Sequence, residues 1–299
     1  MIKRIVDVSE RAYLRVENRQ MVISKGGEEA GRIPVEDLGV VMLAHPAIVV
    51  TQSLVVACQK NNVALVFCDE KHLPYSLLLP ISDGNRLHQK ILRRQIEASK
   101  VVKKNIWKQI VVQKIQNQSY VLELGGKEYK HVRMLAKRVR SGDPANTEAV
   151  AARKYWSLLF GSSFRRDRES GGVNGLLNYG YAVIRSMIAR AVVGGGLHPA
   201  LGIKHGNQYN GLCLADDLME PIRPWVDWSV MKVLEEGGST VIDRENKRML
   251  LGIPGVTVEY KGRRMPLMVA CHHIVSDFKS ALSGDKTVVT YPGFSAMSV

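Results

Sequence analysis

The sequence predicts an α+β protein in which an N-terminal β-sheet or sandwich domain is followed by a larger, all-α-helical domain. Short apolar runs rich in β-branched residues fill the first eighty positions, a pattern typical of strands. From residue 86 onward, apolar residues recur every three to five positions, which favours helices. A turn-rich stretch, PISDGN, separates the two patterns. We therefore expect a β-rich domain over residues 1–75, a linker over 76–90, a helical domain over 91–283 and a loose tail over 284–299.

Each strand predicted in the first domain has its own signal. The stretch YLRVENRQMVIS, residues 13–24, alternates apolar and polar side chains around a polar centre and predicts a hairpin. Residues 33–35 and 39–43 add two short apolar strands. Thr51 is placed to cap a short helix over residues 53–61, and the run VALVFC that follows is typical of a buried strand.

Start and stop signals for helices punctuate the second domain. Asp143 and Pro144 are expected to start a helix, because aspartate caps free backbone amides and proline fits a first turn. A glycine triplet at 194–196 is expected to end the helix that runs through residues 181–193. The last residues of the chain show little periodicity, which is why we expect a loose tail.

The chain is strongly basic, with 42 Lys and Arg against 28 Asp and Glu, a formal charge of +14 and a pI near 9.7. Fifteen of these cations and only three acidic residues lie between residues 86 and 140, which gives that segment a net charge of +12. A solvated helix face, the alternative interpretation, normally mixes charge signs. The excess therefore favours contact with a polyanionic backbone, most simply that of a nucleic acid.

Membrane, disulfide and zinc-site interpretations find little support in the sequence. It has no run of about 18 apolar residues and no signal segment, so we expect a cytoplasmic protein without membrane contact. The four cysteines form no CxxC pair, and we interpret them as reduced thiols in apolar surroundings. Cys271, His272 and His273 are immediate neighbours whose side chains point in different directions, so we interpret them as structural.

Glu148 is the first candidate for chemistry. It lies in NTEAVAARKYW, where Glu148, Ala152 and Tyr155 share one helical face, and the small alanine leaves room beside the carboxylate. The alternative is a glutamate in a first helical turn that only interacts with the helix dipole.

A second candidate region is GGGLHPALGIKHGNQYNGLCLADDLMEPIRPWVD. His205 lies there in a glycine-flanked segment, so the backbone can approach a substrate closely. Asp216 and Asp217 would each share a helical face with Glu220, and these like charges require a cation between them. Arg223 could supply that cation without any metal.

Two carboxylates and one imidazole, from Glu148, His205 and Glu220, suit Mn²⁺ or Mg²⁺ held partly by substrate phosphate oxygens. Such an ion would activate an attacking oxygen and stabilise charge at a phosphodiester. The spacings of 57 and 15 residues define no motif by themselves. The residues alone therefore predict a basic two-domain protein with a metal-phosphoester site.

Six stretches, spread over about residues 1–280, carry a likeness to a known family. They are AYLRVENRQMVIS, IPVEDLGVVML, VALVFCDEKHLP, SGDPANTEAVAARKYW, VNGLLNYGYAVIRSMIARAVVGGGLHPALGIKH and LADDLMEPIRPWVD. In this order they closely resemble the CRISPR-associated integrase family, Cas protein one, and in particular its type II branch.

The resemblance implies a β-rich dimerisation domain, a helical catalytic domain that binds DNA, and a homodimer. The family's catalytic and metal-binding positions fall on Glu148, His205 and Glu220, and Asp217 matches an acidic position near the site. Lys204 stands where many relatives carry another histidine, and Trp225 where a smaller apolar residue is common. Neither departure removes a ligand.

The activity implied by the resemblance is that of a metal-dependent DNA endonuclease and integrase in antiviral CRISPR adaptation. The 3′-hydroxyl of a captured double-stranded DNA fragment attacks a phosphodiester at the border of a CRISPR repeat and inserts the fragment as a spacer. No cofactor beyond Mn²⁺ or Mg²⁺ is implied. The implied partners are a small ferredoxin-like adaptation subunit, which forms a heterohexamer with two integrase dimers, and in type II systems the effector nuclease.

Two alternatives stay open. In a non-catalytic DNA-binding module, the acidic cluster would pair with Arg223 and no metal-dependent chemistry would occur. A general metal-dependent nuclease acting on branched or single-stranded DNA would use the same site with water in place of a 3′-hydroxyl.

Overall fold

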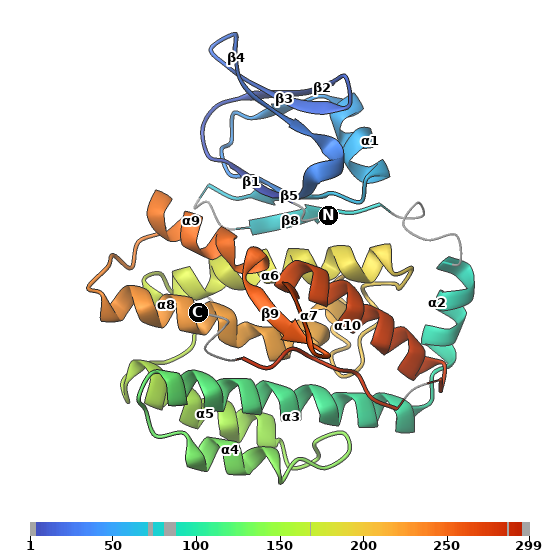
Figure 1. Cartoon of the computed structure of the whole chain (residues 1–299), viewed down its shortest axis with the longest axis vertical. Coiled ribbons are helices and arrows are strands. Elements are labelled where there is room, and N and C mark those ends of the chain that lie inside the picture. Colours follow the sequence, from blue (N-terminus) through green and yellow to red (C-terminus); the bar gives the residue numbers. More distant parts are fainter. Residues whose placement is uncertain (1–3, 71–73, 81–87, 168, 286, 295–299) are drawn as a thin grey trace.

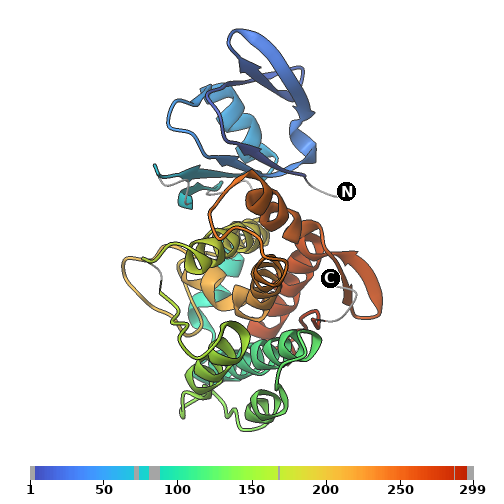
Figure 2. The same cartoon turned by 90° about the vertical axis from the view of Figure 1, so that its left-hand side faces the viewer.

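The computed structural model describes residues 4–70, 74–80, 88–167, 169–285 and 287–294 (Figure 1). A β-rich N-terminal domain lies against a larger helical domain, and the view at right angles in Figure 2 shows the same division. The expected α+β class is confirmed. The helical domain is not purely helical, because it carries a hairpin of β9 (Thr257–Tyr260) and β10 (Arg263–Pro266) that we did not predict.

The N-terminal domain contains two four-stranded sheets and one helix. Its elements are β1 (Arg4–Val8), β2 (Tyr13–Glu17), β3 (Gln20–Lys25), β4 (Glu28–Pro34), η1 (Val35–Asp37), β5 (Leu38–Leu43), β6 (Val49–Val50), α1 (Gln52–Lys60), β7 (Ala64–Cys68) and β8 (Pro74–Leu78).

Both sheets combine hairpins with crossover connections between parallel strands. The first sheet has the order β1-β5-β7-β8, in which β1, β5 and β7 are parallel and β8 is antiparallel to β7. The second has the order β4-β3-β2-β6, and its β2-β3 pair is the hairpin expected from alternation. Thr51 caps α1 as expected, since its hydroxyl accepts from the amide of Leu54. Strands β1 and β8 were not predicted.

The first sheet is buried on both faces, which explains its nearly continuous apolar strands. The face toward the helices presents Val40, Met42, Ala64 and Val66. The opposite face, toward the second sheet and α1, presents Val41, Leu43 and Leu65. This sheet therefore joins the two cores, and β8 extends it to Leu78, beyond the expected domain end at residue 75. Residues 81–87 of the expected linker lie outside the described part of the chain.

The helical domain is built around one long buried helix, α6. Its helices are α2 (His88–Glu97), α3 (Lys100–Leu124), α4 (Lys130–Ala136), α5 (Thr147–Phe160), α6 (Val173–Gly194), α7 (Cys213–Met219), α8 (Arg223–Glu235), α9 (Arg244–Gly252) and α10 (Leu267–Leu282), with short 3₁₀ turns η2 (Glu220–Ile222) and η3 (Ile253–Gly255). The expected end of α6 at the glycine triplet is confirmed, although the helix starts earlier than residue 181. No helix among the described residues is long and apolar enough to cross a bilayer.

The start of α5 differs from its prediction in one respect. The two carboxylate oxygens of Asp143 accept hydrogen bonds from the amides of Thr147 and Glu148, both at 2.9 Å, so the expected capping is confirmed. Pro144 lies in the preceding loop and not in the first turn. The reason is that Asp143 and Asn146 adopt positive φ angles of 46° and 50°, which interrupt a helix before Thr147.

The cysteines are free thiols, as expected. Burial raises the pKa of the Cys58 thiol to about 12, so it is inert at neutral pH. The structural interpretation of the Cys271-His272-His273 stretch is also supported by its contacts. His272 lies 3.2 Å from the guanidinium of Arg190, and the ring of His273 stacks on Tyr260.

The C-terminal segment is not loose over its described residues, which corrects our expectation for 284–299. Val289, Tyr291 and Phe294 are buried in the helical core. Two side chains of α3 hold the segment through their amide oxygens. Gln109 accepts a hydrogen bond from the backbone amide of Val289, and Asn117 accepts one from the backbone amide of Phe294. Periodicity missed these contacts because an extended segment can pack through isolated side chains. Residues 295–299 lie outside the described chain.

Phe294→Ala is expected to lower the free energy of unfolding by about 3–5 kcal/mol, because Phe294 is 1% exposed and its ring lies 5.0 Å from that of Trp225. Urea denaturation measures the change. Tyr75→Ala, at a position that is 84% exposed, is the matched control and should change the value by less than about 0.5 kcal/mol. Equal effects of the two substitutions would show that the C-terminal segment does not contribute to the core.

Candidate active site

Glu148 and Glu220 converge on the ammonium group of Lys114. Glu148 lies in the first turn of α5, Glu220 opens the 3₁₀ turn after α7, and Lys114 lies near the middle of α3 (Figure 1). The Nζ atom of Lys114 is 2.6 Å from Glu148 Oε1 and 2.6 Å from Glu220 Oε2. Two of the three predicted site residues, 72 positions apart in the chain, therefore share one cation.

Lys114 itself was missed by sequence reasoning. It is buried on the apolar side of α3, in a stripe with Ile110, Val111 and Ile115. Burial lowers its pKa, but the charges of Glu220 and Glu148 outweigh that effect and hold the pKa above its ordinary value, so the side chain is charged. A lysine inside an apolar helical stripe is the signal that could have identified it, since such a lysine needs buried anions.

Glu220 is held by two cations. Arg223 lies 3.0 Å from its Oε1, so this arginine supplies one counter-charge. Burial raises the pKa of Glu220, but Arg223 and Lys114 dominate and lower it to about 2. The contact between Lys114 and Oε2 is close yet lacks hydrogen-bond geometry, so Oε2 is a buried acceptor with no hydrogen-bond donor among the described residues.

The remaining acidic residues of the cluster diverge from Glu220, contrary to our expectation of a shared face around one cation. Asp216 pairs with Arg185 at 2.6 Å and accepts from the side chain of Asn210. Asp217 is fully buried and faces His205. The expectation failed because each carboxylate has partners of its own: Arg185 for Asp216, His205 for Asp217, and Lys114 with Arg223 for Glu220.

His205 is positioned through its Nδ1 atom. Asp217 Oδ1 lies 2.5 Å from this nitrogen, while Asp217 Oδ2 accepts from the amides of Ile203 and Lys204 at 2.6 and 3.0 Å. The edge of the imidazole packs against Trp107. The hydrogen bond with Asp217 raises the pKa of His205, although partial burial lowers it. Because Nδ1 is engaged, Nε2 is the ring nitrogen left for a ligand or substrate.

Two other residues support the loop that carries His205. Gln95 of α2 is buried, donates to the carbonyls of His198 and Leu201, and accepts from the amide of His198. A Cβ atom on Gly202 would lie only 2.2 Å from the carbonyl oxygen of His205. The glycine is therefore required for a close approach within the loop.

The site opens into a cleft with a volume of about 680 Å³. Glu220 and His205 line it together with three arginines, namely Arg166, Arg185 and Arg223. Asp69 and Asp216 line it as well, so the cleft carries charges of both signs. Its arginines suit a substrate that brings its own negative charge.

The chemistry of the carboxylate pair fits a divalent cation, and Glu148 and Glu220 are the residues that would hold it. Both oxygens already face one positive charge, and the Oε2 atom of Glu220 lacks a hydrogen-bond donor. His205 is close enough for both carboxylates to raise its pKa. In the described part of the chain, however, no three His, Cys, Asp or Glu side chains meet as a ready-made metal cluster. Lys114 occupies the position between the two carboxylates instead.

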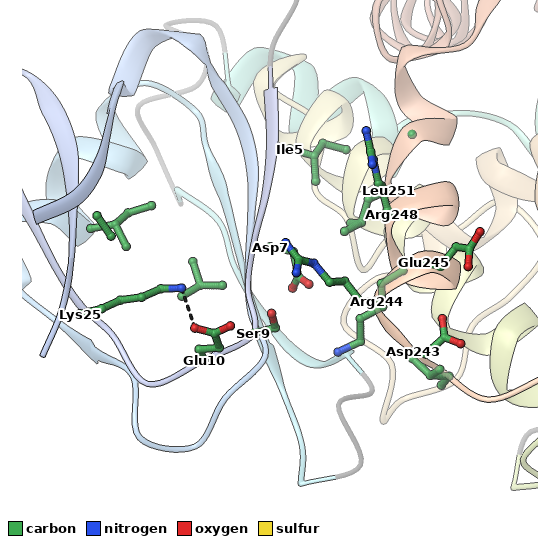
Figure 3. Close-up of a pocket in the computed structure, with 16 residues that line it drawn as sticks. Ile5, Asp7, Ser9, Glu10, Lys25, Asp243, Arg244, Glu245, Arg248 and Leu251 are labelled. Atoms are coloured by element: carbon green, nitrogen blue, oxygen red, sulfur yellow. Dashed lines mark hydrogen bonds and ion pairs between the residues drawn. The ribbon is translucent and has the colours of Figure 1, made fainter.

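A larger cleft of about 1290 Å³ lies between β1 and α9, away from these residues. Figure 3 shows Asp7 and Ser9 on one side and Arg244 and Arg248 on the other. Charges of both signs line this cleft too, and one pair inside it, Lys25 with Glu10, forms an ion pair at 2.7 Å. It brings together neither the carboxylates nor the histidine of the candidate site, so size does not identify the reactive centre.

A buried network lies behind Arg223. Its guanidinium stacks on Tyr181, whose hydroxyl donates to Asp227, and Tyr155 donates to the same carboxylate at 2.8 Å. Burial raises the pKa of Asp227 to about 6, although the two tyrosines and Arg223 act in the opposite direction. The network fixes one wall of the cleft.

Asp227→Asn is expected to change the pH dependence of stability. A carboxyl group whose pKa is raised by folding binds its proton more tightly in the folded state. Its contribution to the free energy of unfolding therefore falls as pH rises from about 4 to 6. Between pH 4 and pH 7, the free energy of unfolding of the asparagine variant should therefore rise by up to about 3 kcal/mol relative to that of the unsubstituted protein. Urea denaturation across this range measures the difference. Parallel stability curves for the two proteins would refute a raised pKa.

Comparison with known proteins identifies the family. The model for "CRISPR associated protein Cas1" matches residues 6–265. The chain belongs to the Cas1 family. It is 39% identical over 239 residues to the CRISPR-associated endonuclease Cas1 of Neisseria meningitidis serogroup C (strain 8013), a match that covers 79% of this chain and 78% of the relative. It is 26% identical over 314 residues to a Cas1 endonuclease of Francisella tularensis subsp. novicida (strain U112), covering 95% and 96% of the two chains.

Solved structures agree with the Cas1 fold. A casposase bound to its integration product matches with a TM-score of 0.79 at 19% identity, over 97% of this chain and 92% of that one. A Cas1 protein from Thermotoga maritima matches with a TM-score of 0.74 at 14% identity, over 94% and 97%. A Cas6-RT-Cas1–Cas2 complex matches with a TM-score of 0.76 at 16% identity, over 95% of this chain and 35% of that one.

Proposed function

We propose that this Cas1-family protein is a metal-dependent DNA integrase of CRISPR adaptation, which joins the 3′-hydroxyl of a captured DNA fragment to a phosphodiester in the repeat array. The observation that carries the proposal is the convergence of Glu148 and Glu220 on Lys114, with Glu220 lining a cleft that also contains three arginines. Family membership and the likeness to a casposase bound to an integration product support it.

Each residue has a defined part in the proposed reaction. Glu148 and Glu220 provide oxygen ligands and His205 provides Nε2 for Mn²⁺ or Mg²⁺, which when bound supplies stabilisation of charge on the reacting phosphodiester. Asp217 holds the imidazole through Nδ1. Arg223 keeps Glu220 ionised, and the arginines of the cleft bind phosphates.

The proposed assembly is a homodimer on double-stranded DNA with a small Cas2-type adaptation subunit. The likeness to a complex that contains Cas1 and Cas2 supports this partner. Its contribution is testable in the reaction itself, by adding the purified small subunit.

A strand-transfer assay tests the function directly. A labelled duplex with free 3′-hydroxyl ends is mixed with a supercoiled plasmid carrying the CRISPR repeat, in the presence of Mn²⁺, with and without the small subunit. We expect labelled joint molecules, and a duplex ending in 3′-dideoxynucleotides, the matched control, should give none. Cleavage of the plasmid at an equal rate with both duplexes, and no joining, would favour the general nuclease over the integrase.

DNA affinity is expected to fall steeply with salt, and part of that dependence should come from Lys103, Lys104 and Lys108 on α3. Each phosphate contact on duplex DNA adds about −0.9 to the slope of log K against log salt, so the triple glutamine variant should flatten the slope by up to about 3. Fluorescence anisotropy at several salt concentrations measures it.

Replacement of Lys60 and Lys232, which lie on α1 and α8, is the control and should leave the slope unchanged. An unaltered slope in the triple variant would mean that these lysines form only a solvated face.

A further inference from the structure

The ammonium group of Lys114 is in close contact with Glu148 and Glu220, the two carboxylates proposed as metal ligands. Among the described residues it has no other partner. We propose that Lys114 is an internal counter-ion that holds Glu148 and Glu220 together in the metal-free protein and is displaced by the divalent cation, its charge then being taken up by a DNA phosphate. Binding of metal and of DNA is thereby coupled. This inference rests on the proposed function.

The contact geometry indicates a counter-ion that can be exchanged. Lys114 donates a hydrogen bond to Glu148, but its equally short contact with Glu220 lacks hydrogen-bond geometry. The lysine therefore supplies charge to both carboxylates and satisfies the hydrogen-bonding capacity of one. A cation ligated by both oxygens satisfies the two together.

A divalent cation disturbs the charge balance of the buried cluster. Lys114 and Arg223 already neutralise Glu148 and Glu220, and all four side chains are largely buried. A divalent cation added to this set leaves two uncompensated positive charges within a few ångströms of each other, which is strongly unfavourable away from bulk water. Either the lysine leaves or negative charge enters.

DNA offers the compensating charge at the right place. Lys114 Nζ lies 2.6 Å from an oxygen of Glu220, and Glu220 lines the arginine-rich cleft. A lysine carries a compact charge with three donors on a flexible stem, which suits a transfer from a carboxylate to a nearby phosphate. Because coupling between two ligands is reciprocal, DNA must raise the affinity for metal as much as metal raises the affinity for DNA.

The test measures Mn²⁺ affinity by isothermal titration calorimetry, with and without a short duplex. We expect Lys114→Gln to bind Mn²⁺ about ten- to a hundredfold more tightly than the unsubstituted protein in the absence of DNA. The duplex should improve the affinity of the unsubstituted protein and leave that of Lys114→Gln nearly unchanged. Lys114→Arg retains the charge and should not bind more tightly, and Lys60→Gln, an exposed lysine on α1, is the matched control.

The outcomes separate this inference from the function on which it rests. Equal Mn²⁺ affinities for the unsubstituted protein and Lys114→Gln, with binding lost in Glu220→Gln, would overturn the counter-ion role and leave the metal site standing. Absence of saturable Mn²⁺ binding in every protein, with and without DNA, would overturn the metal-dependent function and this inference together.

A second measurement needs no variant, in case Lys114→Gln does not fold. Lysines of the unsubstituted protein are acetylated with acetic anhydride and each site is quantified by mass spectrometry. Lys114, buried between two carboxylates, should react slowly, and Mn²⁺ without DNA should increase its labelling severalfold while Lys60 stays constant. Labelling of Lys114 that is unchanged by saturating Mn²⁺ would overturn the proposal.

Discussion

Glu220→Gln is expected to lower strand transfer at least about a thousandfold, and Glu148→Gln to have a similar effect. Both substitutions keep the size of the side chain and remove its negative charge, so they weaken the binding of a divalent cation without opening a cavity. Because the two carboxylates act on the same ion, the double variant should lose little more than either single one. Initial rates of joint-molecule formation measure all three.

The control for these variants is Glu235→Gln, which removes an exposed carboxylate from the end of α8. It should transfer strands at the rate of the unsubstituted protein. Glu220→Gln leaves Arg223 and Lys114 with one anion fewer, so its melting temperature and DNA affinity are measured alongside to show that it is folded. A folded Glu220→Gln variant with near-normal strand transfer would exclude that residue from the site.

Asp217→Asn is expected to lower strand transfer about ten- to a hundredfold, the usual effect of losing a group that orients a metal-binding histidine. The amide oxygen can still accept from the amides of Ile203 and Lys204. The amide nitrogen then faces His205 Nδ1 and favours the tautomer with a proton on Nε2. The protonated Nε2 atom then has no lone pair left to bind a cation.

The tautomer of His205 distinguishes this role from a merely structural one, because a loss of loop stability alone would not change which ring nitrogen carries the proton. Nitrogen-15 spectra of the imidazole should show the proton on Nδ1 in the unsubstituted protein and on Nε2 in Asp217→Asn. Asp216→Asn is the matched control, because Asp216 pairs with Arg185 and not with the histidine. Loss of activity with an unchanged tautomer would mean that Asp217 acts through the stability of the loop.

Much of the architecture followed from local patterns. The hairpin over residues 13–24, the cap at Thr51 and the end of α6 at its glycines depend on neighbours in the chain, and all three were confirmed. The packed C-terminal segment was missed because its partners are distant in sequence, whereas strand β8, also missed, pairs with β7 directly before it. The segment is held by Gln109 and Asn117, more than 170 residues away.

The sequence by itself determined the family, the fold class and the candidate residues Glu148, His205 and Glu220, since family motifs and apolar periodicity are properties of the chain. Only the tertiary structure decided how those residues are charged and held. It brought Lys114 between two carboxylates and turned Asp217 toward the histidine. The physical reason is that a buried charge is stabilised by whichever opposite charge lies within a few ångströms, and α3, α5 and η2 come that close only when the core has packed.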